Sequence, residues 1–314
     1  MKLFAGIDGG QSSTTALVAD ASGKILGTGH AGPADEVGQD AHSTRLHDAF
    51  HLALSHALRA AHAFPDTAFA AVVAGLSGYN GSVIGTAPKI KSDIFEMVHD
   101  TRIAHAAAFG GGEGVLVIAG TGSVAFGVDA EGAECRIGGW GYLFGDQGSA
   151  FWIGRRLIER AMSDQDLGLP STVRKRVLAY FEAQELADIS DAFYGGRIDR
   201  AKIAALASVA ADLAHDGIDD ARLIIEQSAD ACAVLAALCT RRLHGNKRIT
   251  AGDLPVSFSG GLMRDAAFAE RVYARVHVRL AQSRIVRSDA TPAVGALMLA
   301  YRAAGLEPLP RVQR

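Results

Sequence analysis

The sequence predicts an α/β protein built from two halves of similar architecture, with a cleft between them. An apolar strand, a turn of glycine and hydroxyl residues and two further strands occur near the N-terminus, and the same order recurs from residue 115 onward. Segments with helical periodicity follow each set, which is typical of α/β domains. A cleft between two such halves is a common position for a ligand site.

The bulk composition excludes several classes of protein. The chain has 314 residues, of which 49% are hydrophobic and 21% charged, as in ordinary globular proteins. A net charge of −3 argues against a nucleic-acid partner. We find neither a signal peptide nor an unbroken apolar run of the roughly 20 residues that span a bilayer, so no membrane partner is expected. Three cysteines without metal-like spacing indicate a reducing, cytoplasmic environment.

The first half is expected to contain five strands and two helices. The strands are 3–7, 15–19, 24–29, 68–75 and 94–98, and the helices are 41–63 and 102–109. The second half is expected to contain strands 115–119, 124–128, 134–137, 255–259 and 284–287, and helices 149–161, 171–183, 200–215, 220–243, 265–278 and 292–304. The predicted domains are residues 1–105, completed by a C-terminal helix at 290–314, and residues 106–289.

The turn from Asp8 to Ser13 joins the first two strands and reads Asp-Gly-Gly-Gln-Ser-Ser. Its glycines let backbone N–H groups approach phosphate oxygens, and the hydroxyls of Ser12 and Ser13 add donors. Asp8 is suited to a hydrated Mg²⁺, which prefers carboxylate and water ligands. An ordinary Asp-Gly hairpin turn explains the same residues equally well.

Two further glycine turns follow strands in the second half. Gly120-Thr121-Gly122-Ser123 occupies the place of the first turn, and this pairing favours phosphate binding over two coincident hairpins. It is no Walker A loop, because Gly-Lys-Ser/Thr does not follow. Ser259-Gly260-Gly261-Leu262 ends a strand and opens a helix. A plain strand-to-helix turn is the simpler interpretation, and nucleotide binding at a helix N-terminus is the functional one.

Asp100 follows a strand and precedes a helix. A carboxylate there can accept a proton from an attacking hydroxyl, while phosphoryl transfer otherwise depends mainly on positioning and charge neutralisation. The alternative is that Asp100 only caps the helix.

Residues 138–148 contain five glycines, which exclude a stable helix or strand. Trp140, Tyr142 and Phe144 within this glycine-rich loop favour a sugar-facing or interface surface, and Asp146 can accept hydrogen bonds from sugar hydroxyls. An irregular loop explains the glycines, but not the aromatic and acidic side chains among them.

Together these motifs resemble the BadF/BadG/BcrA/BcrD ATPase family of the actin–hexokinase–Hsp70 superfamily, and within it the N-acetylglucosamine kinases. The resemblance is most specific in three segments that occur in the family's order: Gly120-Thr121-Gly122-Ser123, Gly138-Gly139-Trp140-Gly141 and Gly145-Asp146-Gln147-Gly148-Ser149-Ala150. It implies two ribonuclease-H-like domains hinged around ATP, in a chain that forms a homodimer.

The resemblance also implies roles for single residues. Asp100 would take the proton from the C6 hydroxyl of an amino sugar, and Asp8 would hold Mg²⁺ through water. The implied ATP and phosphate contacts are Gly9, Gly10, Gln11, Ser12, Ser13, Gly120, Thr121, Gly122, Ser123, Gly260 and Gly261. The implied sugar contacts are Asp35, Ser77, Gly139, Trp140, Gly141 and Asp146.

Three positions depart from the family pattern. The first turn lacks the usual Lys, and Gln147 replaces a common Glu. Asp35 stands where an Asn often contacts the sugar, and an extra carboxylate there would suit the free amine of glucosamine. The expected reaction is the phosphorylation of N-acetylglucosamine. The alternatives are a glucosamine kinase, an ATPase that activates an electron-transfer partner, and a sugar sensor without kinase activity.

Overall fold

The structure, a computed structural model, describes residues 2–245, 254–307 and 312. The chain divides into two compact units, with Met1–Gly114 and Val286–Arg314 in unit 1 and Val115–Ile285 in unit 2. The expected boundary after residue 105 falls inside a helix, and the units divide instead after that helix, at Gly114.

Unit 1 contains a mixed five-stranded sheet in the order β3-β2-β1-β4-β5. Its strands are β1 (Leu3–Gly9), β2 (Thr14–Asp20), β3 (Ile25–Ala31), β4 (Ala71–Leu76) and β5 (Phe95–His99). Its helices are α1 (Arg45–Ala60), α2 (Asp100–Phe109) and α10 (Pro292–Ala303). Strands β1, β2 and β3 form an antiparallel meander, whereas β4 and β5 run parallel to β1.

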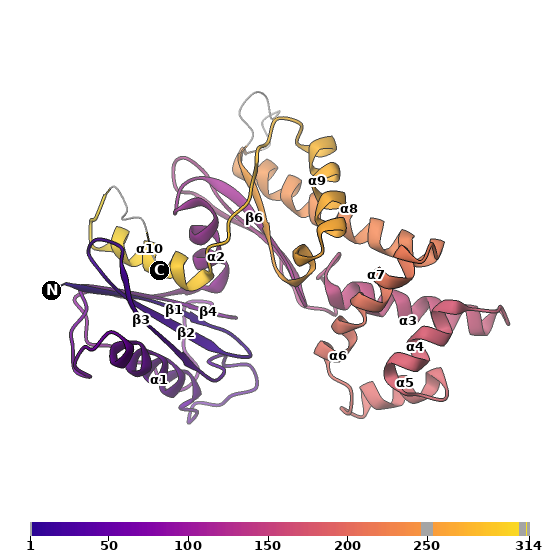
Figure 1. Cartoon of the computed structure of the whole chain (residues 1–314), viewed down its shortest axis with the longest axis horizontal. Coiled ribbons are helices and arrows are strands. Elements are labelled where there is room, and N and C mark those ends of the chain that lie inside the picture. Colours follow the sequence, from indigo (N-terminus) through magenta and orange to yellow (C-terminus); the bar gives the residue numbers. More distant parts are fainter. Residues whose placement is uncertain (1, 246–253, 308–311, 313–314) are drawn as a thin grey trace. The chain divides into compact units, whose positions relative to one another are not determined.

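The two faces of this sheet are covered by different helices. Leu3, Ala5 and Ile7 of β1 point into a core shared with α1, whereas Phe4 points into the opposite core with α10. This alternation is the period of two expected of a strand buried on both sides. Figure 1 shows α1 on one side of the sheet and α10 on the other. Unit 1 is therefore a three-layer arrangement of helix, sheet and helix.

Glycines allow close contact where α10 packs on its neighbours. A side chain at Gly295 would collide with the carbonyl of Ile103 and the amide of Ala107 in α2. One at Gly6 of β1 would collide with the backbone at Leu297 of α10. Because these obstacles are backbone atoms rather than flexible side chains, neither position has room for a larger residue.

Unit 2 repeats this sheet order. Its sheet runs β10-β9-β6-β7-β8, with β6 parallel to β9 and β7 antiparallel to β8. Its strands are β6 (Gly114–Ala119), β7 (Ser123–Val128), β8 (Glu134–Gly138), β9 (Val256–Ser259) and β10 (Ile285–Val286). The first strand of each set thus lies at the centre, and the predicted duplication of architecture is confirmed.

The remaining elements of unit 2 are helical. They are α3 (Ala150–Asp166), α4 (Thr172–Phe181), α5 (Leu186–Tyr194), α6 (Arg200–Ala205), α7 (Ala207–His215), α8 (Asp219–Leu243), the 3₁₀ turn η1 (Gly261–Arg264) and α9 (Ala266–Arg279).

Two of these helices differ from the expectation. The helix expected at 200–215 is divided at Leu206, whose N–H donates to Ile203 three residues back, so the chain tightens there before α7 continues. Helix α5 was not expected. Its start is fixed by a reciprocal capping box between Glu185 and Asp188, a local signal that the sequence does contain.

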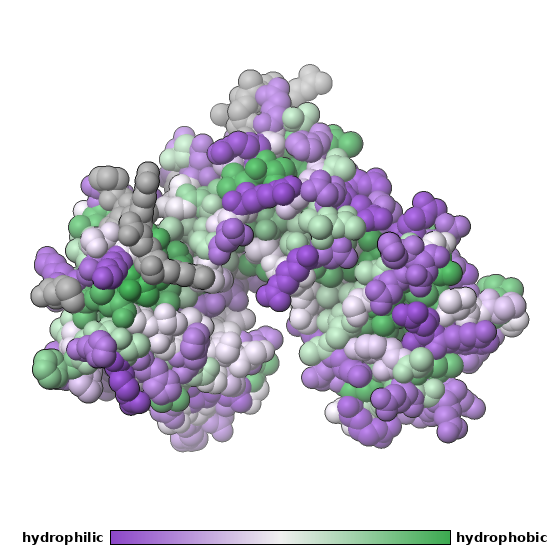
Figure 2. All heavy atoms as spheres, in the orientation of Figure 1, coloured by the Kyte–Doolittle hydropathy of each residue, from purple (hydrophilic) through white to green (hydrophobic). Residues whose placement is uncertain are grey.

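Helix α8 is long and apolar enough by composition to count as a candidate membrane span, although it contains no unbroken apolar run. Within unit 2, 56% of its apolar window is buried, in a core shared with the sheet and α9. The visible face over α8 and α9 mixes hydrophilic and hydrophobic residues (Figure 2). Packing within the unit accounts for the apolar composition of α8.

We expect Gly295→Ala to lower the free energy of unfolding by about 1–3 kcal/mol, because the added methyl group must displace the backbone of α2. Gly32→Ala is the matched control, since a side chain there meets no atom within 4 Å. Urea denaturation of both variants measures the effect. Equal stabilities would contradict the close contact between α10 and α2.

Candidate functional site

Several predicted site residues of unit 1 emerge at one edge of its sheet. Gly9 of β1 pairs with Leu76 of β4, and Leu76 pairs with His99 of β5, so three parallel strands end in line. The residues that follow them are Gly10, Ser77 and Asp100. Ligands of α/β proteins bind outside the carboxyl ends of parallel strands. The ladder therefore gathers these predicted residues where a ligand is expected.

The turn between β1 and β2 is a closed hairpin turn with its side chains outward. The Gly10 N–H donates to the Ser13 carbonyl at 3.0 Å, and the Ala34 N–H donates to the Gly10 carbonyl at 3.0 Å. Gln11, Ser12 and Ser13 are exposed. This geometry fits both an ordinary hairpin and a turn that offers hydroxyl groups to a phosphate.

Asp8 and Asp100 form an unfavourable pair of charges. Burial, and after it the negative charge of Asp100, raises the pKa of the Asp8 carboxyl to about 6. A divalent cation would relieve this repulsion. Among the residues that the structure describes, no group of three or more His, Cys, Asp or Glu side chains could hold a metal ion. A single carboxylate such as Asp8 can hold Mg²⁺ when water and phosphate oxygens supply the other ligands.

His99, rather than Asp100, caps helix α2. Its Nδ1 accepts the Thr101 N–H at 3.2 Å and also lies 2.7 Å from Oδ1 of Asp100. An unprotonated Nδ1 accepts from Thr101, whereas a protonated one donates to Asp100, so the two contacts are alternatives. The capping role that the sequence allowed for Asp100 therefore belongs to its neighbour. The Asp100 side chain is one-third exposed, at 33%.

Asp35 is buried and engaged by protein groups. Its Oδ1 accepts a hydrogen bond from Nη1 of Arg45 at 3.3 Å, and its Oδ2 accepts one from the Val37 N–H at 3.3 Å. The side chain of Asp35 is only 8% exposed. Its charge is thus already compensated by a cation of the same unit.

Unit 2 brings its two glycine turns to one edge in the same way. Ile118 near the end of β6 pairs with Ser259 at the end of β9. Gly260 follows with φ +104°, and a side chain there would collide with the backbone of Ala119, so only glycine fits. A side chain at Gly261 would meet open space.

The turn from Gly120 to Ser123 exposes one hydroxyl and buries the other. Thr121 is exposed, whereas Ser123 is 4% exposed. The Ser123 hydroxyl donates to the Gln147 carbonyl at 2.8 Å, and the Ser123 N–H donates to Oδ1 of Asp146 at 3.2 Å. Ser123 therefore fixes the shape of the turn, and Thr121 is the residue that can meet a ligand.

A cavity of about 950 Å³ lies within unit 2 beside these turns. This volume is at the upper end of the range for small-molecule sites. Its walls include both turns and the first residue of α3: Gly120, Thr121, Gly261, Leu262 and Ala150. A second wall consists of alanines from α6 and α7: Ala201, Ala204, Ala205, Ala207, Ala211 and Ala214. Because these side chains are small, the helices leave room for a bulky ligand.

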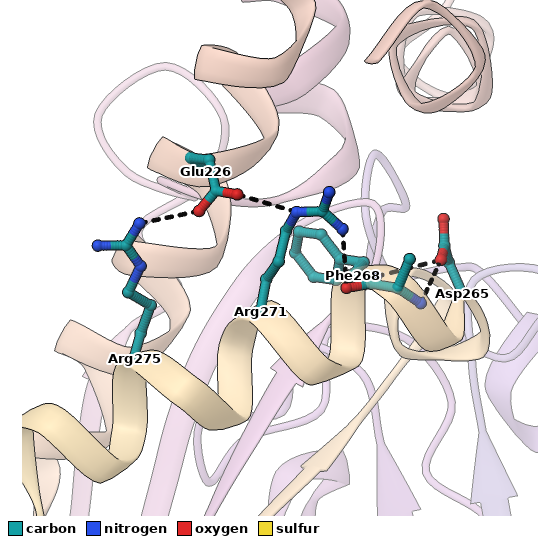
Figure 3. Close-up of polar contacts among 6 residues, drawn as sticks. Glu226, Asp265, Phe268, Arg271 and Arg275 are labelled. Atoms are coloured by element: carbon teal, nitrogen blue, oxygen red, sulfur yellow. Dashed lines mark hydrogen bonds and ion pairs between the residues drawn. The ribbon is translucent and has the colours of Figure 1, made fainter. Parts of the chain in front are cut away.

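Arg271 of α9 lines the same cavity and is held by an ion-pair network (Figure 3). Its Nε donates to Oε1 of Glu226 at 2.9 Å, and Arg275 donates to Oε2 of the same carboxylate at 2.8 Å. The two arginines and the hydrogen bonds lower the pKa of Glu226. Asp265, also in the wall, caps α9 by accepting the Phe268 N–H. This part of the wall is therefore held in place before any ligand binds.

The glycine-rich loop 138–148 exposes its aromatic residues and buries its acid. Phe144 is 81% exposed, and Trp140, which lies between Gly139 and Gly141 at positive φ, is 77% exposed. Asp146 is 3% exposed and itself adopts φ +58°. Its Oδ2 accepts a hydrogen bond from Arg200 at 2.9 Å, in addition to the Ser123 contact on Oδ1. Both oxygens of this predicted sugar ligand are thus engaged by protein groups.

The sequence profile of the BadF/BadG/BcrA/BcrD ATPase family matches residues 5–300. The chain belongs to this family. An ATPase needs a cavity that can hold a nucleotide, and the unit 2 cavity of about 950 Å³ has Gly120 and Thr121 in its wall.

Two curated relatives of this chain are named as sugar kinases. The N-acetylmuramic acid/N-acetylglucosamine kinase of Clostridium acetobutylicum is 32% identical over 42% of this chain and 40% of its own length. The N-acetyl-D-glucosamine kinase of Dictyostelium discoideum is 23% identical over 95% of this chain and 98% of its own. The match thus spans less than half of the first relative and nearly all of the second.

The fold of this chain also matches solved structures. A Chromobacterium violaceum protein, provisionally assigned as an N-acetylglucosamine kinase, has a TM-score of 0.74 at 23% identity, over 96% of this chain and 99% of its own. The ROK hexokinase of Thermus thermophilus has a TM-score of 0.58 at 16% identity, over 97% and 100%. These likenesses confirm the predicted two-domain actin-like ATPase fold.

Sequence reasoning missed Arg200, Arg271 and the alanine wall of α6 and α7. None of them belongs to a glycine motif, and Arg200 lies 54 positions from its partner Asp146. The available signal was weak: alanines recur in the helical segment from 200 to 215, as they do in many buried helices.

The raised pKa of Asp8 predicts a pH-dependent stability. The pKa of Asp8 is about 6 in the folded protein and 3.8 ordinarily, so the folded state binds the proton more tightly than the unfolded state. The resulting contribution to the free energy of unfolding is fully present below about pH 4 and is lost as the pH rises through 6. Without divalent cations, Asp8→Asn should therefore raise the free energy of unfolding by about 3 kcal/mol at pH 8 and change it little at pH 4. Denaturant titrations at both pH values measure this. Asp100→Asn should give a smaller effect of the same sign, and a pH-independent effect of Asp8→Asn would contradict the pair.

Proposed function

We propose that this protein is an ATP-dependent sugar kinase that phosphorylates the C6 hydroxyl of N-acetylglucosamine. The single observation that carries the proposal is the alignment of β1, β4 and β5, because it brings a carboxylate, a hydroxyl and a glycine turn to one edge of the unit 1 sheet. Family membership and the sugar-kinase names of both curated relatives support the choice of reaction.

The cavity of unit 2 is the proposed nucleotide site. Its volume suits a nucleoside, and Gly120 and Thr121 at its wall suit the phosphates, because glycine admits oxygens close to the backbone N–H groups. Leu262 and the alanine wall would cover the apolar faces of the base. The held guanidinium of Arg271 adds a positive charge to this wall.

Asp100 is the proposed general base. As the C6 oxygen bonds to the γ-phosphorus of ATP, the bond from that phosphorus to the β–γ bridging oxygen breaks and ADP leaves. The hydroxyl proton passes to the Asp100 carboxylate and then to solvent. A protonated His99 can hold this carboxylate through Nδ1, 2.7 Å away, and so limit its rotation.

Asp8 is the residue that would hold Mg²⁺. The ion supplies charge neutralisation for the phosphates when bound. Its binding would favour the ionised form of Asp8, which burial and Asp100 disfavour in the structure described. Ionised Asp8 is thus electrostatically unfavourable in the folded chain, and it lies where the proposed Mg²⁺ would stabilise its charge.

The environment of Asp35 favours N-acetylglucosamine over glucosamine. A free ammonium group at Asp35 would have to compete with Arg45, which already compensates the carboxylate charge, and with the hydrogen bond that the Val37 N–H donates. The acetylated sugar is neutral and needs no such acid. The names of both curated relatives point to N-acetylated sugars as well.

The buried cysteines argue against an electron-transfer activator. A cluster ligand must be an accessible thiolate, whereas Cys135, Cys232 and Cys239 are all buried. Burial raises the pKa of the Cys232 thiol to about 12. A sugar sensor remains the second alternative, and it predicts ATP turnover that no sugar accelerates.

We expect Asp100→Asn to lower kcat by about 100- to 10,000-fold, because the amide cannot accept the hydroxyl proton. Calorimetric affinity for the sugar should stay within a few-fold of wild type, since the side chain keeps its shape. A coupled ADP-release assay over hexoses and amino sugars measures turnover. Wild-type turnover in the variant would rule out Asp100 as the base, and sugar-independent turnover in wild type would support the sensor.

We expect Asp35→Asn to change kcat/KM for N-acetylglucosamine and for glucosamine by the same factor. The substitution removes the charge that pairs with Arg45, and this disturbs the segment whichever sugar is bound. A loss confined to glucosamine would show that Asp35 reads an amine and would overturn the preference for the acetylated sugar.

A further inference from the structure

Arg200 connects three parts of unit 2 that are far apart in the sequence. It is the first residue of α6, and its Nη2 donates to Oδ2 of Asp146 at 2.9 Å. Oδ1 of the same carboxylate accepts the Ser123 N–H at the start of β7. Two hydrogen bonds therefore join helix α6, the glycine-rich loop and the turn proposed to bind phosphate.

The guanidinium group also lies directly on the phosphate turn. A side chain at Gly122 would come within 2.8 Å of both Arg200 Nη2 and Asp146 Oδ2. The ion pair is thus seated against the backbone of this turn, and a larger residue at position 122 would displace it. Any shift of Arg200 would alter the support of the turn.

A second contact ties Arg200 to the aromatic part of the glycine-rich loop. Its guanidinium carbon lies 5.5 Å from the ring centroid of Tyr142, within the range of a cation–π interaction. The Tyr142 ring packs edge-on against Phe151 of α3, with centroids 5.0 Å apart. The loop that carries Trp140 is therefore held by Arg200 at two points, Tyr142 and Asp146.

Stability alone does not explain this placement. Nε of Arg200 is buried and makes no hydrogen bond within the part of the chain that the structure describes. An unpaired buried N–H group is unfavourable by about 1–3 kcal/mol. The contacts with Asp146 and Tyr142 therefore hold the guanidinium group in place against this unfavourable term.

The residues that follow Arg200 in α6 form the cavity wall. Ala201, Ala204 and Ala205 line the proposed nucleotide site. A ligand that displaces α6 would also move Arg200, which forms the ion pair with Asp146. The path from the cavity to the glycine-rich loop consists of one helix, one ion pair and one loop.

We propose that Arg200 is a positioning residue that couples nucleotide binding in the cavity to the glycine-rich loop through Asp146. This inference rests on the proposed function for the identity of the nucleotide.

The emission of Trp140 tests this coupling without a sugar. Trp152→Phe leaves Trp140 as the only tryptophan of the chain, because the sequence contains two. In this background, saturating ADP or a non-hydrolysable ATP analogue should change the Trp140 emission. Arg200→Gln and Asp146→Asn should each abolish the change, and the double variant should lose nothing more. Arg200→Lys should restore part of it, since charge is kept but the planar fork is lost.

Arg197→Gln is the matched control. It removes the same charge three residues away, on an exposed side chain, and should keep the wild-type response. Calorimetry should also show that nucleotide tightens the affinity for N-acetylglucosamine by about 5- to 150-fold in wild type and far less in Arg200→Gln.

A wild-type emission change in folded Arg200→Gln or Arg200→Lys would overturn the coupling role. No emission change in the Trp152→Phe background despite calorimetric nucleotide binding would overturn it as well. Absence of any nucleotide binding would instead refute the proposed function. If Arg200→Gln does not fold, as judged by circular dichroism, Arg200→Lys and Asp146→Asn decide the question.

Discussion

The parallel register of β1, β4 and β5 is the constraint on which the unit 1 site depends. Its backbone hydrogen bonds align the ends of the three strands, Gly9, Leu76 and His99, although these residues are 67 and 23 positions apart along the chain. Close packing supports this register. Gly6 lets the backbone of α10 lie directly against β1, and Gly295 lets α10 lie directly against the backbone of α2. The same strand pairing thus supports both the candidate site and the core. A change in the packing of α10 would therefore shift the residues at the strand ends.

The chemistry proposed for this edge depends on two negative charges that lie close together. Burial and Asp100 raise the pKa of Asp8, so the fold loses stability in order to hold two carboxylates near each other. Functional sites commonly carry such costs, whereas a site that served only stability would pair each acid with a base. Asp35 in the same unit shows that contrast, since Arg45 forms an ion pair with it.

Unit 2 uses the same sheet order for a different purpose. Its strand ends support two glycine turns, and the short helices α6 and α7 complete the cavity with alanine side chains. The division of these helices at Leu206 matters here, because each short helix can then present its own small side chains to the same space. Arg200 begins the first of them and ties the wall to the turn.

The sequence by itself determined the duplicated strand–turn–strand order, the family and the glycine turns, because these depend on local periodicity and on backbone angles that only glycine adopts easily. It also placed Asp100 at a strand end. The tertiary structure alone decided that His99 caps α2, that Ser123 turns inward and that Asp146 and Asp35 are paired with arginines. Such side-chain partners are chosen by packing between segments that may lie anywhere along the chain, and no local pattern records that choice.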